Sequence, residues 1–189
     1  MSGERIVLGI SGASGIPIAV RTASALSAHF DVHTVVTDAA RTVMGKETGD
    51  REATLHRLES VSTHVYGESE LGAPIASGSV PTAGMAVVPA SMNTIADMAT
   101  GRSGNLLTRA ADVTLKEDRQ LVVVPRETPL GEIHLENLLE LRRRGVAVVP
   151  PVLGFYFEPE NVEDLIDHVV GKVLERFDVD HDRYRSWEG

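Results

Sequence analysis

The sequence predicts an α/β fold, in which a parallel sheet lies between two layers of helices. Three observations indicate this fold. Short apolar runs alternate with stretches of helical periodicity, most of these runs are apolar at nearly every position, and the glycine-rich turn GISGASG follows the first run. Strands that are apolar throughout are typical of sheets buried on both faces, and alternation with helices favours parallel neighbours. A chain of 189 residues suffices for one domain with its own core.

The expected elements follow one another in a regular order. The runs expected to form strands are 5–10, 31–37, 83–90, 120–126 and 145–151. The stretches expected to form helices are 16–30, 38–47, 94–101, 105–117, 131–145 and 159–177. The helix at 131–145 carries leucines on one side and ends in RRRG, which suits a helix C-terminus. The last helix is expected to open with Pro159 and Asn161. The Gly-, Pro- and Ser-rich segment 68–84 is the longest expected loop. We therefore expect residues 1–189 to form a single domain with a C-terminal tail from about 178.

Composition excludes several classes of function. The net charge of −9 speaks against a nucleic-acid partner, because no broad basic face is available to neutralise phosphates. The absence of cysteine excludes a disulfide framework, a thiolate metal site and a cysteine nucleophile. The histidines show no metal-ligand spacing and are interpreted as surface or packing residues. No apolar run approaches the roughly 20 residues of a membrane span, and no signal peptide is recognisable, so a cytoplasmic protein is expected.

The glycine-rich loop is the first candidate binding site. Ligands of parallel α/β sheets bind at the carboxyl ends of the strands, and this loop joins such an end to a helix. Free N–H groups and the positive helix end there suit an anion such as phosphate, whereas a tight turn without a ligand is the alternative. The spacing of Gly9, Gly12 and Gly15 differs from the dinucleotide pattern, and no Gly-Lys-Ser/Thr follows. A nicotinamide site and a Walker loop are therefore disfavoured.

Two further groups of polar residues follow strand ends. ASMNT at 90–94 offers hydroxyl and amide donors, although helix capping by Ser91 or Asn93 accounts for either residue alone. Together with the glycine-rich loop, this segment suits a phosphate and a ribityl chain. Arg126 and Glu127 come directly after the apolar run LVVVP, where a charged pair points into the crevice.

The predicted helix before that run carries two more cations. Arg109 and Lys116 are seven residues apart and therefore share a helical face. Pairing with neighbouring carboxylates on a solvated surface is the alternative interpretation. With Arg126 they would surround Glu127 with three cations, a group suited to phosphate binding and acid–base chemistry.

These motifs together resemble one family. GISGASG, SGS, PASMNT, LLTRAADVTLKEDRQLVVVPRETPL and PPVLGFYFEPENVEDLIDHVVGKVLE are similar to the corresponding segments of UbiX-type flavin prenyltransferases. The resemblance covers the chain from Arg5 to about Trp187, and 106–130 is its most specific part. It implies a three-layer Rossmann-like or flavodoxin-like fold, FMN bound at subunit contacts, and a homo-oligomer, often a dodecamer. It further implies that a dimethylallyl group passes from dimethylallyl phosphate to N5 and C6 of reduced FMN, for use by a UbiD-type decarboxylase.

The resemblance also implies roles for individual residues. The positions that match FMN-binding residues are Gly12, Ala13, Ser14, Thr37, Ser91, Met92, Asn93, Thr94 and Arg126. Tyr156 and Lys172 match the residues that bind the donor phosphate, and Trp187 matches a C-terminal aromatic residue. The polar catalytic positions are Arg109, Lys116, Glu127 and Glu47. Cationic side chains suit a dianionic leaving group, Glu127 is the first candidate to relay the proton released from the flavin ring, and no metal is expected to be required.

The chain departs from the family pattern in places. GASG is followed by Ile16, Pro17 and Ile18, where the family often has alanine and an aromatic residue, which changes the expected shape around the flavin and prenyl chain. Lys172 stands where many relatives have arginine, so a bidentate phosphate contact is lost. The related flavin-containing cysteine decarboxylases are disfavoured, because this chain has no histidine in the first helical turn and no cysteine. A non-catalytic FMN-binding subunit of a decarboxylase complex remains the alternative.

Overall fold

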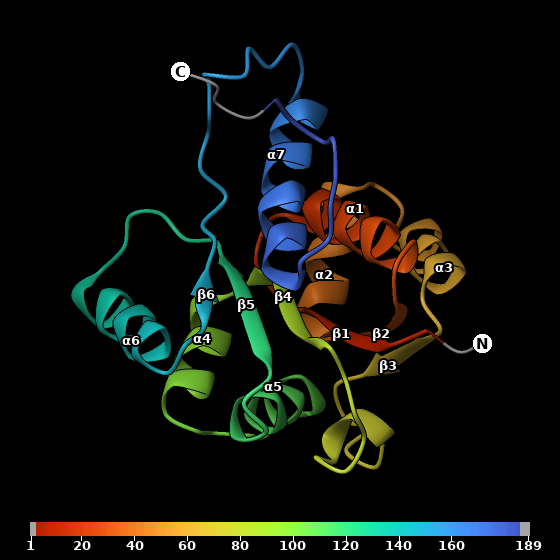
Figure 1. Cartoon of the computed structure of the whole chain (residues 1–189), viewed down its shortest axis with the longest axis vertical. Helices are drawn as coiled ribbons and strands as arrows, with labels where there is room; N and C mark the ends of the chain where they lie inside the picture. The colour runs from red at the N-terminus through yellow and green to blue at the C-terminus, as the bar shows by residue number, and fades with distance from the viewer. Residues whose placement is uncertain (1–2, 186–189) are drawn as a thin grey trace.

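The computed structural model describes residues 3–185, and a parallel sheet of 6 strands forms its centre (Figure 1). The strands lie in the spatial order β3-β2-β1-β4-β5-β6, and every neighbouring pair is parallel. The strands are β1 (Arg5–Ile10), β2 (Asp31–Val36), β3 (His64–Gly67), β4 (Gly84–Ala90), β5 (Gln120–Pro125) and β6 (Ala147–Val148). The predicted α/β fold, with its parallel sheet, is thus confirmed.

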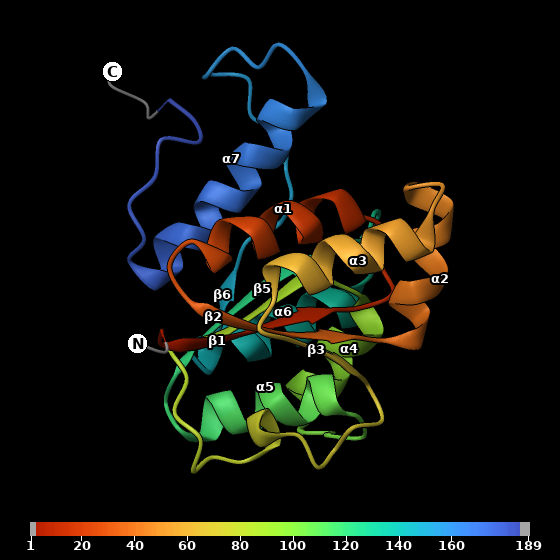
Figure 2. The same cartoon turned by 90° about the vertical axis from the view of Figure 1, so that its right-hand side faces the viewer.

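Helices cover both faces of this sheet. They are α1 (Ile16–Ser27), α2 (Asp38–Glu47), α3 (Arg51–Val61), α4 (Met92–Ala99), α5 (Leu106–Lys116), α6 (Glu132–Arg143) and α7 (Val162–Leu174), with short 3-10 turns η1 (Pro74–Ala76) and η2 (Glu175–Phe177). Buried side chains of α1, α2, α3 and α7 form one apolar cluster with the sheet, and those of α4, α5 and α6 form a second cluster on the other face. Figure 2 shows the two layers edge-on, with α1, α3 and α7 on one side and α5 on the other. None of the helices within 3–185 has the length and apolar character that crossing a bilayer demands.

The structure corrects several expected elements. Helix α3 and strand β3 are not predicted by the sequence, because 51–61 is rich in charged residues and His64–Gly67 gains its strand conformation by pairing with β2. The expected strand at 145–151 is paired only at Ala147–Val148, since the prolines that follow cannot donate to a sheet ladder. The last helix opens after Asn161, whose side chain accepts from Asp164 N at 3.0 Å, so Pro159 lies outside it.

The chain reverses its direction of winding between β1 and β4. Strands β2 and β3 are added on one side of β1, and β4, β5 and β6 follow on the other side. In open parallel sheets a ligand crevice forms at this point, outside the carboxyl ends of the strands. The loop after β1 and the segment after β4 lie at this point, so the fold places the two predicted donor segments next to each other.

Candidate active site

Ser11 connects the glycine-rich loop to the end of β4. Its side chain is 1% exposed, its hydroxyl donates to Pro89 O at 2.9 Å, and the same oxygen accepts from Ser91 N at 2.7 Å. The backbone N–H of Ser11 also donates to Pro89 O, at 3.2 Å. The loop from Ser11 to Gly15 and the segment from Ser91 onward are therefore held side by side by one buried and one partly buried hydrogen bond of the Ser11 side chain.

Thr37 fixes the third strand end at this edge. It is the N-cap of α2, where its hydroxyl oxygen accepts from Ala40 N at 3.1 Å. The hydroxyl also donates to Ile10 O at 3.3 Å, which ties the end of β2 to the end of β1. Because the hydroxyl proton is used inside the protein, the Thr37 side chain can accept a hydrogen bond from a ligand but cannot donate one.

Three helices begin at these neighbouring strand ends. The first N–H groups of α1, α2 and α4 have no partner within their helices, and each helix directs the positive end of its dipole to the crevice. Ser91 caps α4, accepting from Thr94 N at 3.3 Å and lying 3.0 Å from the Thr94 hydroxyl. A set of backbone N–H groups, hydroxyls and the Asn93 amide fits a phosphate and a polyhydroxyl chain. The donor chemistry of this edge thus fits the FMN predicted from the sequence.

Close packing of the loop against α2 explains why position 12 is a glycine. A Cβ built on Gly12 would lie 2.4 Å from the Ala39 Cβ in α2, a distance that real carbon atoms do not adopt. Ala13 packs next to it and is buried, while Ser14 follows at the surface of the loop. Gly12 therefore allows the loop to lie directly against α2, close to the amino end of that helix.

The carboxylate of Glu47 occupies the amino end of α1. It accepts from Gly15 N at 3.0 Å and from Ile16 N at 2.9 Å, although 31 residues separate Glu47 from Ile16. The positive end of α1 is thereby paired with a side chain of the chain itself. An anionic ligand at this edge would then be bound mainly by the amino ends of α2 and α4. The structure brings Glu47, a predicted catalytic residue, to the glycine-rich loop.

Arg126 and Glu127 lie beside the second donor segment. Arg126 N donates to Ala90 O at 3.1 Å, so the residue is fixed next to the segment that begins at Ser91. Both side chains are exposed, and the Glu127 carboxylate accepts from Thr128 N at 2.9 Å. The structure therefore brings Arg126 and Glu127 to the edge that carries the predicted FMN residues.

Arg109 and Lys116 are not part of the group that Arg126 and Glu127 form within one chain. Helix α5 ends where β5 begins, so Lys116 is at the amino end of β5, about 20 Å along the strand from Arg126. Arg109 donates to Ala76 O at 3.2 Å and to Asp112 at 2.8 Å, and Lys116 pairs closely with Glu117. The hydrogen bond from Lys116, with its charge, holds the pKa of Glu117 below the ordinary value. One chain therefore does not surround Glu127 with three cations.

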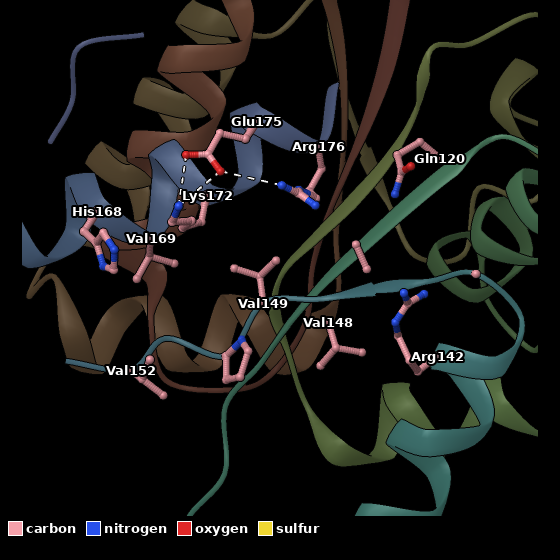
Figure 3. A pocket seen from close by; sticks show the side chains of 13 residues that line it. Gln120, Arg142, Val148, Val149, Val152, His168, Val169, Lys172, Glu175 and Arg176 are labelled. Carbon is pink, nitrogen blue, oxygen red and sulfur yellow. Dashed lines mark hydrogen bonds and ion pairs between the residues drawn. The ribbon is translucent and has the colours of Figure 1, made fainter. Parts of the chain in front are cut away.

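Lys172 lines a separate cavity, and Tyr156 is linked to that lining through His168. A volume of about 560 Å³ lies between α7 and the β6 edge of the sheet, and Lys172, Glu175 and His168 line one side of it (Figure 3). Lys172 donates to both carboxylate oxygens of Glu175, at 3.1 and 3.2 Å. Tyr156 reaches this group through His168, whose Nε2 lies 3.1 Å from the tyrosine hydroxyl. The lining of the cavity includes none of the residues at the β1 and β4 strand ends, and Trp187 lies outside the described residues.

Electrostatics keep the two basic side chains of α7 in different charge states. Burial lowers the pKa of His168, and the neighbouring Lys172 lowers it further, so the imidazole is held neutral. Burial also acts to lower the pKa of Lys172, but hydrogen bonds to Tyr184 and Glu175 and the charge of Glu175 outweigh it. The pKa of Lys172 is therefore raised on balance, and the side chain stays cationic. Within 3–185 no cluster of three or more His, Asp or Glu side chains is arranged to hold a metal ion.

Sequence reasoning does not single out several of these residues. Ser11 stands in the sequence only as one of two serines in the loop, and its burial between two strand ends depends on the sheet order. His168 is expected among the surface or packing residues, and it is indeed buried, but its hydrogen bond to Tyr156 requires two segments to meet in the fold. The spacing of Lys172 and Glu175 on one helix face is the one available signal for their ion pair.

Comparisons with known proteins assign the chain to a family. The Flavoprotein family model matches residues 1–174. A protein of Lactiplantibacillus plantarum named flavin prenyltransferase LpdB is 44% identical over 188 residues, which cover 98% of this chain and 99% of that protein. A crystal structure of a dodecameric FMN-dependent UbiX-like decarboxylase from Escherichia coli O157:H7 superposes with a TM-score of 0.93 at 41% identity, covering 98% of this chain and 100% of that one.

A further solved structure carries ligands. It is AnUbiX (PadA1) in complex with FMN and dimethylallyl pyrophosphate, with a TM-score of 0.93 and 39% identity, and the match covers 99% of this chain and 98% of that one. Sequence and fold agree over almost the whole length of the chain. The chain therefore belongs to the flavoprotein family of UbiX-type flavin prenyltransferases.

Proposed function

We propose that this protein joins a dimethylallyl group to reduced FMN, using dimethylallyl phosphate as the donor and producing prenylated FMN. In the overall reaction the carbon–oxygen bond to phosphate breaks, and N5 and C6 of reduced FMN each exchange a hydrogen for a bond to the prenyl unit. The alkene of that unit gains one hydrogen and becomes saturated, and the second proton leaves to phosphate or solvent. The observation that carries the proposal is the convergence of the α2 and α4 amino ends, Ser91 and Arg126 at one sheet edge, next to Glu47 and Glu127.

The flavin side of the site is formed by fixed groups. Reduced FMN supplies the nucleophilic atoms of the reaction when it is bound. Gly12, Ala13 and Ser14 in the loop and Ser91, Met92, Asn93 and Thr94 after β4 are proposed to bind it, with Thr37 as an acceptor and Arg126 as a cation. The hydrogen bonds of Ser11 to both strand ends support this, because they set the separation of the two segments before a ligand binds.

The donor side of the site is cationic. Breaking an allylic carbon–oxygen bond leaves phosphate with additional negative charge, which Lys172 and the hydroxyl of Tyr156 are proposed to stabilise. Arg109 and Lys116 are proposed to add charge from α5. Glu127 is exposed at a strand end, where its carboxylate can accept the proton that C6 releases and pass it to solvent or phosphate. Trp187 is proposed to shield the prenyl chain.

A complete site is proposed to need more than one copy of the chain. Lys116 lies at the opposite end of β5 from Arg126, and the cavity beside Lys172 includes no strand-end residue of the FMN group. Large apolar side chains are exposed on α6 and on the arm at 149–161, which projects beyond α7 in Figure 1; they include Ile133, Leu135, Leu139, Val152, Leu153 and Phe155. These faces support a homo-oligomer, proposed to be a dodecamer, in which neighbouring copies complete each site.

The first experiment is anaerobic. The purified, assembled protein is mixed with reduced FMN and dimethylallyl phosphate, and the mass of the extracted flavin is measured. A flavin heavier by one dimethylallyl unit supports the proposal. Unchanged flavin with both the monophosphate and the diphosphate donor contradicts it and favours a non-catalytic FMN-binding subunit. The mass of the assembly, from light scattering after gel filtration, tests the dodecamer in the same preparation.

The product is proposed to serve a UbiD-type decarboxylase in the cytoplasm. A reduced flavin substrate is favoured in the reducing cytosol, which supports this location. Adding the reaction mixture to an apo-decarboxylase of that type, and measuring recovery of decarboxylation, tests the transfer. The reaction mixture lacking the prenyl donor is the control, and equal recovery from both mixtures would contradict the proposed product.

A further inference from the structure

The last described segment of the chain lies along α7. Asp178, with φ at 54°, ends the turn η2 and lets the chain reverse, and residues 179–185 then run back beside the helix in both views (Figures 1 and 2). We call residues 179–185 the C-terminal strap. Val179 is buried and donates from its backbone N to Leu174 O at 3.3 Å, while the Arg183 guanidinium binds Asp167 at 2.5 Å. The strap is thus fixed to α7 at both of its ends.

Gly171 makes this close approach possible. A Cβ built on Gly171 would lie 2.6 Å from His181 Cε1 and 2.6 Å from Tyr184 Cε1. The imidazole Nε2 of His181 lies 3.0 Å from Gly171 O, so the strap contacts the helix backbone itself. Any larger residue at this position would displace the His181 and Tyr184 rings from these positions against α7.

Tyr184 of the strap contacts Lys172, one of the two groups proposed to bind the donor phosphate, and His168, which lies within hydrogen-bond distance of the other, Tyr156. Its ring lies under the Lys172 ammonium, with Nζ 4.9 Å from the ring centroid, and its hydroxyl donates to the Glu175 carboxylate that Lys172 also contacts. The same ring packs edge-on against His168, with centroids 4.8 Å apart. Tyr184 therefore limits the rotamers of Lys172 directly and those of His168 by packing.

His168 transmits this contact to Tyr156. Its Nε2 lies 3.1 Å from the Tyr156 hydroxyl, and its Nδ1 is buried with no hydrogen-bond partner among residues 3–185. A buried N–H without a partner is costly, so the proton of the neutral ring belongs on Nε2, where it donates to Tyr156. Through this hydrogen bond His168 fixes the position of the Tyr156 hydroxyl.

We propose that Tyr184 is a positioning residue, which places Lys172 directly and Tyr156 through His168 for binding the phosphate of the prenyl donor. This inference rests on the proposed function, since it concerns the same donor site. It adds that the strap is part of that site although the strap itself does not contact the donor. The expected signature is weaker donor binding with unchanged flavin binding.

Gly171→Ala is the main test, because it displaces the Tyr184 and His181 rings and changes no polar side chain. Gly45→Ala is the matched control: Gly45 also lies within a helix, and a Cβ built there would have no neighbour closer than Arg51 Cβ at 3.9 Å. We expect Gly171→Ala to raise KM for dimethylallyl phosphate about tenfold, with kcat within about twofold and an unchanged Kd for FMN. A wild-type KM in an assembled Gly171→Ala protein would overturn the proposal.

Two substitutions of Tyr184 separate positioning from folding. Tyr184→Phe keeps the ring against Lys172 and His168, whereas Tyr184→Leu removes it. We expect KM to rise about tenfold in Tyr184→Leu and by no more than about threefold in Tyr184→Phe. Equal effects of the two substitutions would contradict a positioning role for the ring. These variants also decide the question if Gly171→Ala fails to assemble.

A measurement without catalysis keeps this inference separate from the proposed function. Lys46, Lys116 and Lys172 are the lysines of the chain, so acetylation by an N-hydroxysuccinimide ester can be followed for each by peptide mass spectrometry. We expect Lys172 to react faster in Gly171→Ala than in the wild type, relative to Lys46. If the wild type makes no product, the proposed function fails, but faster labelling still supports the strap's control of Lys172. An unchanged labelling rate of Lys172 would show that the strap does not restrain this side chain and would overturn the proposal.

Discussion

Glu47 offers the sharpest test of how the flavin edge of the sheet is maintained. Its carboxylate accepts hydrogen bonds from Gly15 N and Ile16 N, at 3.0 and 2.9 Å, and so supplies the cap that α1 otherwise lacks. We predict that Glu47→Ala destabilises the protein through the amino end of α1. Glu47→Gln keeps one oxygen that can accept these bonds, and loses only the charge.

The magnitude follows from the contacts that each substitution removes. Loss of a helix cap costs about 1–2 kcal/mol, and loss of the charge alone at a partly exposed helix end costs about 0.5 kcal/mol. In a chain of this length, 1 kcal/mol corresponds to a shift in Tm of about 2–4 °C. We therefore expect a Tm lower by about 2–8 °C for Glu47→Ala and by about 1–2 °C for Glu47→Gln.

Thermal unfolding of the FMN-free proteins at one fixed protein concentration measures these shifts. Glu59→Ala is the control, because Glu59 is an exposed residue of α3 that pairs with His56 on the same helix. If Glu47→Ala unfolds at the temperature of Glu59→Ala, the cap contributes nothing and the reasoning is refuted. Product formation by Glu47→Gln then separates chemistry from folding: a large loss of product at a nearly wild-type Tm assigns a catalytic role to the carboxylate charge.

Three other predictions address separate parts of the molecule. Glu127→Gln should bind FMN with wild-type affinity and fail to give the completed product by flavin mass, because its carboxylate accepts the released proton; wild-type product would remove Glu127 from this role. Ser11→Ala should lower the free energy of unfolding by about 1–3 kcal/mol and weaken FMN binding, since a buried and a partly buried hydrogen bond are lost. An unchanged denaturation midpoint would contradict it. Hydrogen bonds from Arg21 and then Arg183 outweigh burial and hold the pKa of Asp167 below its ordinary value of 3.8. The stabilisation from Asp167 is therefore fully present above pH 3.8 and is lost as pH falls through the lower folded pKa. Asp167→Asn should be less stable than wild type at neutral pH, with the difference shrinking in acid; a constant difference across that range would refute the linkage.

Local sequence patterns predicted the central strands and most helices because apolar residues recur at regular positions along each of these elements. Runs such as 5–10 and 120–126 are apolar enough that only a doubly covered strand accounts for them. Helix α3 lacks such a pattern: Thr54, Leu55 and Leu58 are its buried residues, and charged side chains surround them. Its position is decided by packing against α1, which no local window contains.

The site was predictable to the extent that parallel strands share one edge. Ser91 and Arg126 follow neighbouring strands, so their proximity follows from the sheet order alone. Lys116 precedes Arg126 closely in sequence, yet a strand separates them and places them at opposite ends of β5. The contact of Glu47 with α1 and that of His168 with Tyr156 join distant segments, and their residue types have many other uses. Such contacts depend on tertiary structure.

The length of β5 has a genetic consequence. If Lys116 of one copy and Arg126 of another serve the same site, variants that each lack one of these residues are inactive alone but not in mixture. Co-assembly of Lys116→Ala and Arg126→Ala chains in equal amounts would restore both residues in about a quarter of the sites, by random pairing at a heterologous interface. A strand that separates two side chains in one molecule would then make the two alleles complement each other.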